Sequence, residues 1–265
     1  MNVALAPHPP VLSIATDQAF VTLRGVTKVF GSGRRAVTAL QDVSLDVADG
    51  EFVCILGASG CGKSTLLSLI AGLDRLTKGS INIADGRPAV MFQEPALLPW
   101  LTVRRNVELP LRIRKVPADE RGRTVNRLLA MVGLIDFADS RPHELSGGMR
   151  QRCALARALA QDSQLLLMDE PFAALDAITR DQLHDDLNRI WQETGRTIVF
   201  VTHNVREAVR LGDRVVLMTP RPGRVAREWD VDITRPRELD APEVAALASE
   251  ITARLRAGGS ADGTH

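Results

Sequence analysis

The sequence predicts an α/β fold built around a largely parallel sheet. Short apolar runs rich in β-branched residues alternate along the chain with longer segments of helical periodicity, as expected for strands joined by crossover helices. The 265 residues are 45% hydrophobic and 25% charged, which is enough for one large domain or for a core with an insertion. This composition excludes a disordered or collagen-like chain, and the formal net charge of +1 argues against charge-driven nucleic-acid binding.

The individual elements follow from these apolar runs. Strands are expected at 20–23, 51–56, 90–92, 164–168, 197–201 and 214–218. Helices are expected at 63–71, 119–132, 147–160, 178–193, 206–211 and 243–256. The last helix opens with Asp240 and Glu243 at capping-box spacing and then repeats apolar residues at helical intervals, which predicts one apolar face.

The two ends of the chain differ from this pattern. Residues 1–19 hold three prolines and no Lys or Arg, so they predict a flexible arm without the charged region of a signal peptide. Residues 257–265 predict a flexible tail, which leaves 20–256 as the ordered domain. No apolar run reaches 18 residues, so no membrane span is expected. The three cysteines form no CxxC motif and are too few for a disulfide framework, which fits a reducing compartment.

A helical insertion is expected in the middle of the domain. From residue 93 to about residue 145 the strand signal disappears and the chain becomes helical and rich in arginine, so we expect a helical subdomain at about 94–160. The run 104–115 carries several of these arginines. It fits either a solvated helix surface or a site for an anionic partner.

A glycine-rich segment between an expected strand and an expected helix predicts a phosphate site. It matches GxxxxGK[ST] in the context that this motif requires. Lys63 should reach the β- and γ-phosphates, and the Ser64 hydroxyl should ligate Mg²⁺. The helix N-terminus and Lys63 should favour a thiolate at Cys61, unless burial keeps this thiol inert. The candidate phosphate-binding residues are Gly57, Ala58, Ser59, Gly60, Cys61, Gly62, Lys63, Ser64 and Thr65.

A pair of carboxylates follows another apolar strand. Asp169 and Glu170 come directly after the strand expected at 164–168. Beside a phosphate-binding loop, one carboxylate can hold the Mg²⁺ shell and its neighbour can polarise the attacking water.

Further motifs identify the kind of nucleotide-binding protein. The segment Leu145-Ser146-Gly147-Gly148-Met149 resembles the LSGGQ signature of the ATP-binding cassette (ABC) ATPases, with Met149 in place of the usual glutamine. Gln93, the segment 174–176 and His203 are similar to the Q-loop, D-loop and switch histidine of that family, in the correct order. The resemblance covers about 20–220. It implies a P-loop NTPase core with a largely parallel sheet, an antiparallel β edge and an inserted helical subdomain.

The resemblance also implies a catalytic role for several residues. Glu170 would be the general base, His203 would contact the γ-phosphate, and Gln93 would assist catalysis. The implied cofactors are ATP and Mg²⁺, and the implied Mg²⁺ ligands are Ser64, Gln93 and Asp169.

A dimer is part of the implied mechanism. In this family the signature, here Ser146, Gly147 and Gly148, completes the ATP site of a second copy, so two chains meet head to tail. Asp176 would communicate across that dimer. Phe30 matches the aromatic residue that stacks on adenine; the alternative is an ordinary core residue at a strand end.

Three segments resemble the nitrate, sulfonate and taurine importer group: 90–103, 203–208 and 219–223. The resemblance implies an energy-coupling subunit at the cytoplasmic face of the inner membrane. Its implied partners are separate permease subunits and a solute-binding protein, and no nucleic acid is expected as a partner. Leu97, Leu98 and Trp100 would either receive a permease helix or fill the subdomain's own core. The alternatives are a cassette of another importer class, or a soluble ABC ATPase that acts on nucleic acid or ribosomes. The sequence leaves the transported substrate open.

Overall fold

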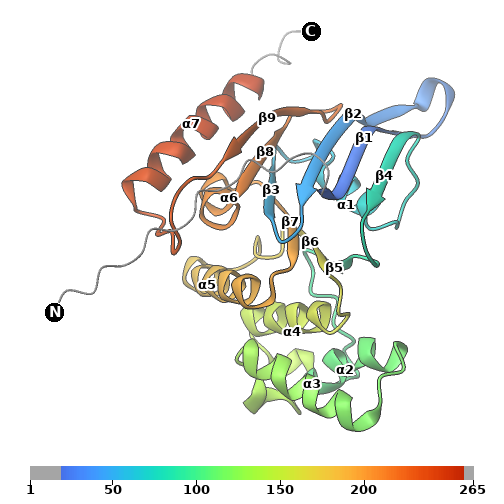
Figure 1. Cartoon of the computed structure of the whole chain (residues 1–265), viewed down its shortest axis with the longest axis vertical. Coiled ribbons are helices and arrows are strands. Elements are labelled where there is room, and N and C mark those ends of the chain that lie inside the picture. Colours follow the sequence, from blue (N-terminus) through green and yellow to red (C-terminus); the bar gives the residue numbers. More distant parts are fainter. Residues whose placement is uncertain (1–18, 260–265) are drawn as a thin grey trace.

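Two sheets form the centre of the molecule (Figure 1). The computed structural model describes residues 19–259. In the larger sheet the first five strands run parallel, and the last is antiparallel to its neighbour. Its strands, in spatial order, are β5 (Ala89–Met91), β6 (Leu165–Asp169), β7 (Thr197–Thr202), β3 (Phe52–Leu56), β8 (Arg214–Met218) and β9 (Val225–Asp230). The smaller antiparallel sheet has the order β2 (Val37–Ala48), β1 (Ala19–Phe30) and β4 (Lys78–Ile83).

The parallel strands are apolar throughout because both of their faces are buried. Along β3, Phe52, Cys54 and Leu56 belong to one apolar core, whereas Val53 and Ile55 belong to another. The second core lies between the two sheets and includes the helix α1 (Lys63–Ile70). This two-sided burial explains why the parallel strands appear in the sequence as short continuous apolar runs.

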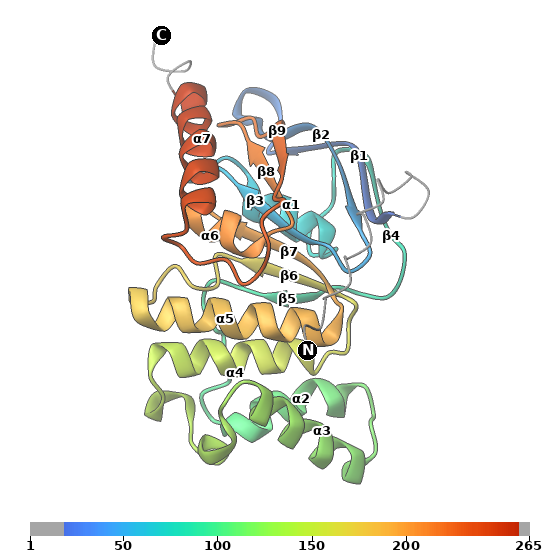
Figure 2. The same cartoon turned by 60° about the vertical axis from the view of Figure 1, so that its left-hand side comes forward.

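The first core is covered by helices (Figure 2). Helix α5 packs beside α4, and α7 packs on α6. Trp229 of β9 and Val244 of α7 belong to the same core, so the end of the described chain is tied to the sheet. These helices are α4 (Gly147–Leu159), α5 (Ala177–Thr194), α6 (Val205–Leu211) and α7 (Pro242–Gly259).

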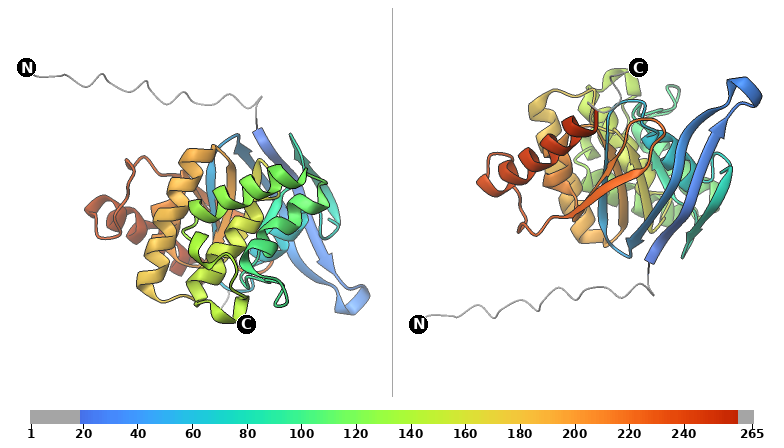
Figure 3. Two further views of the ribbon diagram at one scale, coloured as in Figure 1. Left: turned by 90° about the horizontal axis from the view of Figure 1, so that it is seen from below. Right: turned by 90° about the horizontal axis from the view of Figure 1, so that it is seen from above.

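A helical subdomain projects from the β5 edge of the larger sheet (Figure 2), and it faces the viewer when the molecule is seen from below (Figure 3, left). It contains α2 (Val103–Ile113), α3 (Ala118–Met131) and α4, and no strand lies between β5 and β6 in the described chain. Its apolar residues continue into the core of the sheet through α4. The buried Asn106 side chain bonds the carbonyl oxygens of Leu98, Leu101 and Thr102, which fixes the loop before α2.

The expected parallel sheet, antiparallel edge and helical insertion are confirmed. Strands β2, β4 and β9 and helix α2 were not among the elements expected individually, and β1 is longer than the expected 20–23. The Arg-rich run lies mostly on α2. Arg104 of this helix bonds Asn126, and Arg114, directly after the helix, bonds Asp162.

The expected arm and tail lie outside the described residues, apart from their inner ends. Ala19 already belongs to β1, and 257–259 still belong to α7. Within 19–259, none of the helices is both long enough and apolar enough to cross a membrane.

Candidate active site

A cavity of about 430 Å³ opens at the carboxyl ends of the parallel strands. This edge is where open α/β sheets bind ligands, because the loops that follow the strands meet there. The residues that line the cavity are Phe30, Val37, Ala39, Ser59, Gly60, Gly62, Lys63, Ser64, Thr65, Gln93, Asp169, Glu170 and Arg221. The structure therefore brings together most of the phosphate, metal and base residues predicted from the sequence.

The glycine-rich loop joins β3 to α1. Gly62 caps α1 with a φ of 103°, and a side chain there would meet Leu40 Cδ2 at 2.7 Å, so only glycine fits this position. Lys63 is 4% exposed, and its Nζ donates to the carbonyl oxygens of Gly57 (2.9 Å) and Ala58 (3.2 Å). The loop therefore places one buried cation and the N-terminus of α1 beside the cavity, which suits a bound phosphate.

The acidic end of β6 faces this loop. Ser64 Oγ donates to Oδ1 of Asp169 over 3.0 Å, and burial raises the pKa of the Asp169 carboxyl group above its usual range. Glu170 lies at a positive φ of 43° and places its Oε1 3.6 Å from Lys63 Nζ. Its Oε2 lies 2.8 Å from Nδ1 of His203. The predicted base, metal ligands and switch histidine are thus neighbours in the structure.

Gln93 and Phe30 lie at two other walls of the cavity. Gln93 follows β5, and its carbonyl oxygen accepts a hydrogen bond of 2.9 Å from the buried Gln151 of α4. This bond joins the cavity to the helical subdomain. Phe30 ends β1, is 44% exposed and has Lys28 Nζ 4.7 Å from its ring centroid. Phe30 belongs to neither apolar core, so the alternative of an ordinary core residue does not hold.

The predicted signature and D-loop residues lie away from this cavity. Ser146 caps α4 by accepting from Met149 N (3.2 Å), and Asp176 caps α5 by accepting from Thr179 N (3.0 Å). The capping bonds from Thr179 lower the pKa of the Asp176 carboxyl group. Ser146, Gly147, Gly148 and Asp176 do not line the cavity. Their side of the chain therefore offers two helix N-termini, from neighbouring helices, that are not used by the chain's own phosphate site.

Arg221 is a cavity residue that the sequence did not predict. It lies in the loop between β8 and β9, and its Nη2 donates to the carbonyl oxygen of Gly60 over 3.3 Å. Two residues later a Cβ at Gly223 would overlap the carbonyl oxygen of Cys61, so glycine is required for this close approach. These contacts join segments about 160 residues apart, so no local pattern could have revealed them.

We expect Arg221→Ala to weaken ATP binding about fivefold, because the cavity loses a cation that can hydrogen-bond a phosphate or a ribose. Arg224→Ala is the matched control, since Arg224 lies in the same loop, bonds Gln41 Oε1 (2.6 Å) and does not line the cavity. Titration with a fluorescent ATP analogue measures both affinities. Equal affinities in the two variants would show that Arg221 does not contact the nucleotide.

Cys61 does not have the reactive character expected beside Lys63. Its side chain is buried, and desolvation raises the pKa of the thiol more than Lys63 lowers it. Burial also raises the pKa of Cys54 well above its usual range and that of Cys153 to about 12. Burial therefore contradicts the expectation of a favoured thiolate at Cys61 and favours the alternative of an inert thiol.

A thiol-alkylating reagent should accordingly not inactivate the protein at neutral pH. All three cysteines are buried, so each thiol should react in the folded chain far more slowly than in the unfolded chain. Mass spectrometry after timed alkylation, with and without denaturant, measures this protection. Rapid modification of Cys61 in the folded protein would contradict it.

The comparisons with known proteins agree with this geometry. A family model described as ABC transporter matches residues 40–173. The chain is 46% identical over 257 residues to the aliphatic sulfonates import ATP-binding protein SsuB 1 of Mesorhizobium japonicum, covering 95% of this chain and 94% of that protein. It is 42% identical over 247 residues to the nitrate import ATP-binding protein NrtD of Synechocystis sp., covering 87% and 93% of the two chains.

A similar solved structure is described as a dimeric, post-hydrolysis state of the ATP-binding cassette MJ0796 bound to ADP and Pi. It matches with a TM-score of 0.72 and 36% identity, over 81% of this chain and all of that one. The phosphate loop, the carboxylates at the end of β6 and the separate signature thus occur on a fold that is known to hold a hydrolysed nucleotide. The chain belongs to the ABC transporter family, as an ATP-binding cassette that hydrolyses ATP to energise transport.

Proposed function

We propose that this cassette is the energy-coupling subunit of an importer for a small solute of the sulfonate, taurine or nitrate type. The names of its relatives support this, since they include aliphatic sulfonate, taurine and nitrate import proteins. The structural observation that carries the proposal is the exposure of two aromatic residues that flank, in sequence, a segment beginning at the cavity residue Gln93. Phe92 is 47% exposed and Trp100 is 67% exposed, on either side of the segment that begins with Gln93.

These aromatic residues could bind a permease segment and link its position to the ATP site. Gln93 lines the cavity, and its carbonyl oxygen is bonded to Gln151 of the helical subdomain. A partner helix that packs against Trp100 would therefore contact the end of the segment that runs from the cavity to that subdomain. Docking on separate permease subunits would place the cassette peripherally, at the cytoplasmic face of the membrane, in a complex with a solute-binding protein.

We further propose that two copies of the chain form a head-to-tail dimer. The signature around Ser146 and the D-loop residue Asp176 lie away from the chain's own cavity. A second copy would use them to complete its ATP site, with the N-terminus of α4 facing the phosphates. The related cassette MJ0796, which is dimeric, supports this arrangement.

The residues at the end of β6 fit a Mg²⁺ ion. This ion prefers oxygen ligands and is commonly held by one or two carboxylates together with substrate phosphates. The Ser64 hydroxyl and the Asp169 carboxylate are already adjacent, and Gln93 lines the same cavity. A bound cation would neutralise charge on the phosphates and favour the ionised form of Asp169, which burial alone disfavours.

The remaining site residues divide the chemistry of hydrolysis between them. Lys63 and the loop amides hold the phosphates, and Phe30 supplies a ring face for the adenine. Glu170 accepts a proton from the attacking water as general base. His203, 2.8 Å from Glu170, orients that carboxylate and contacts the γ-phosphate.

The importer proposal predicts a specific coupling defect in Trp100→Ala. Because Trp100 is outside the phosphate site, this variant should keep the basal ATPase rate and the melting temperature of the isolated subunit. Its recovery with the permease from membranes should fall severalfold, since a buried interface aromatic commonly contributes about 2 kcal/mol or more. Leu97 is not substituted, because it packs partly against the first core, which the subdomain shares with the sheet.

Ile113→Ala provides the matched control. Ile113 is an equally exposed apolar residue of the helical subdomain, at the end of α2. The control should behave as the unmodified protein in all three measurements. Equal permease recovery in Trp100→Ala and Ile113→Ala would rule out the docking role, and a ligand screen on the co-purified binding protein would identify the solute.

A further inference from the structure

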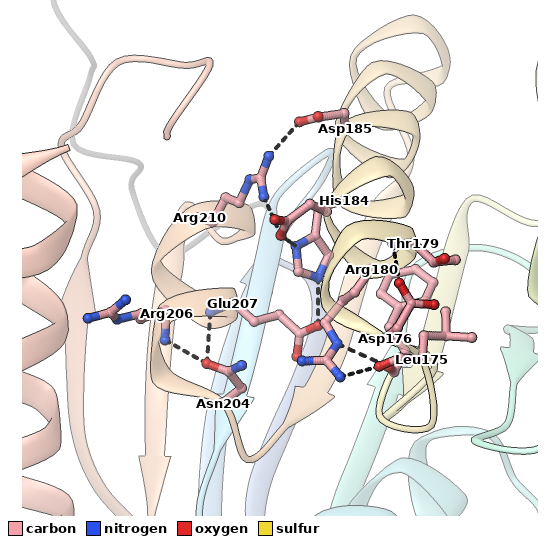
Figure 4. A network of polar contacts seen from close by, with 12 residues as sticks. Leu175, Asp176, Thr179, Arg180, His184, Asp185, Asn204, Arg206, Glu207 and Arg210 are labelled. Carbon is pink, nitrogen blue, oxygen red and sulfur yellow. Dashed lines mark hydrogen bonds and ion pairs between the residues drawn. The ribbon is translucent and has the colours of Figure 1, made fainter. Parts of the chain in front are cut away.

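A buried polar network joins α5 to the end of β7 and the start of α6 (Figure 4). His184 of α5 is 1% exposed, and its Nε2 lies 2.7 Å from Oε1 of Glu207 on α6. Glu207 is also buried, and its second oxygen accepts a hydrogen bond from the Thr202 hydroxyl. None of these three residues lines the ATP cavity.

The network holds the residues on both sides of His203. Thr202 precedes His203 and bonds Glu207, and its Oγ1 also accepts from the backbone N–H of Asn204 (2.9 Å). Asn204 follows His203 and caps α6 by accepting from the N–H groups of Arg206 and Glu207. The backbone of the switch histidine is therefore fixed, from both sides, by groups that are bonded to Glu207.

The same side of α5 also holds the loop that follows Glu170. Arg180, one turn before His184, donates to the carbonyl oxygens of Phe172 (3.2 Å) and Leu175 (2.5 Å). The His184 ring packs against the Phe172 ring, with their centroids 5.6 Å apart. Helix α5 thus contacts both the loop that leads from Glu170 to Asp176 and the group that fixes His203.

Glu207 is not needed simply to hold α6 on α5. Arg210, one turn further along α6, already bonds two carboxylates of α5, with Nη1 to Asp181 Oδ1 (3.0 Å) and Nη2 to Asp185 Oδ1 (2.8 Å). Burying a carboxylate and an imidazole is costly unless both are well hydrogen-bonded. The buried Glu207–His184 pair is therefore explained better by a need to fix the position of His203 than by the packing of α6 on α5.

We propose that Glu207, oriented by His184, is a positioning residue that sets the place of His203 for hydrolysis. The inference rests on the proposed contact of His203 with the γ-phosphate. Glu207 acts only through His203 and does not touch the nucleotide. Its loss should therefore slow hydrolysis without changing the affinity for ATP, because a shift of about 1 Å at a reacting group can cost up to about a hundredfold in rate.

The first test compares Glu207→Ala with Arg210→Ala. We expect Glu207→Ala to lower kcat about tenfold with an unchanged Kd for ATP. Arg210→Ala removes a contact between the same two helices, and should lower the melting temperature while kcat stays within about twofold. Glu207→Gln should recover most of the rate, since an amide can accept from Thr202 and donate to the other tautomer of His184.

The second test is a double-mutant cycle with His203→Ala, followed by single-turnover hydrolysis. If Glu207 acts through His203, Glu207→Ala should cause almost no further loss in the His203→Ala background. Equal fractional losses in both backgrounds, or a loss in Arg210→Ala as large as that in Glu207→Ala, would overturn the inference.

The two tests separate this inference from the proposed site. If His203→Ala hydrolyses ATP normally, the proposed role of His203 is wrong and the positioning role of Glu207 is wrong with it. If His203→Ala is inactive and Glu207→Ala is fully active, only the positioning role is wrong. Should Glu207→Ala fail to fold, Thr202→Val removes the hydroxyl alone and should give the same loss of kcat with unchanged Kd; normal kcat in that variant overturns the inference.

Discussion

Glu170→Gln should abolish ATP turnover and leave ATP binding intact. The amide keeps the size of the carboxylate beside His203 and Lys63 but cannot accept the proton of the attacking water. Loss of a general base costs about 10² to 10⁴ in rate, which makes this the largest expected effect on kcat. Steady-state hydrolysis and equilibrium ATP binding, measured on one preparation, test both parts.

Glu193→Gln is the control for this substitution. Glu193 lies in the last turn of α5, pairs with Arg189 on the surface and does not line the cavity. With ATP, Glu170→Gln should accumulate as a dimer in size-exclusion chromatography, because the sandwiched nucleotide is not hydrolysed. Near-normal hydrolysis by Glu170→Gln would remove Glu170 from the role of base.

Lys63→Ala should weaken ATP binding and hydrolysis together. Lys63 is the buried cation of the phosphate loop. Among the described residues, no other side chain bonds the carbonyl oxygens of Gly57 and Ala58. Losing several charge-assisted hydrogen bonds to a triphosphate should raise the Kd about a hundredfold. Lys78→Ala, at an exposed position of β4, should bind ATP normally.

Ser146→Arg, unlike Lys63→Ala, should impair the dimer and not the binding of ATP by a single chain. Ser146 lies outside the cavity, so a single chain should still bind ATP, whereas the added side chain should block the head-to-tail dimer. The variant also loses the cap of α4, which costs about 1 kcal/mol of stability. Thr102→Arg removes the corresponding cap of α2 and should leave the dimer intact. A loss of ATP affinity in Ser146→Arg equal to that in Lys63→Ala would contradict the role in a second subunit.

The sequence predicted those parts of the fold and site that are encoded locally. The parallel strands are continuous apolar runs because both faces are buried, and the phosphate loop is one uninterrupted segment. Strands β4 and β9 lack such runs, since β4 has no buried residue and β9 buries only Trp229. The antiparallel edge therefore could be expected as a feature of the fold class but not placed residue by residue.

The other differences arise from contacts between distant segments. Arg221 reaches Gly60 across most of the chain, and His184 meets Glu207 only when α5 and α6 pack together. The local sequence around Cys61 favours a thiolate, whereas tertiary packing buries the thiol and raises its pKa. Of these side chains the sequence singled out only Cys61, as a reactive thiol, and only the folded chain determines what surrounds it.

The close approach of Gly223 to Cys61 has a consequence for the order in which a nascent chain matures. The cavity is lined by residues from Phe30 to Arg221. The phosphate loop contacts the β8–β9 loop, which the ribosome synthesises some 160 residues later. Chains long enough to contain the whole phosphate loop, but still short of the β8–β9 loop, lack this backing. A ligand stabilises a protein only in the state that binds it. Cellular ATP should therefore act as a late stabiliser of newly made cassettes, favouring those whose synthesis has passed Gly223 over incomplete chains of the same sequence.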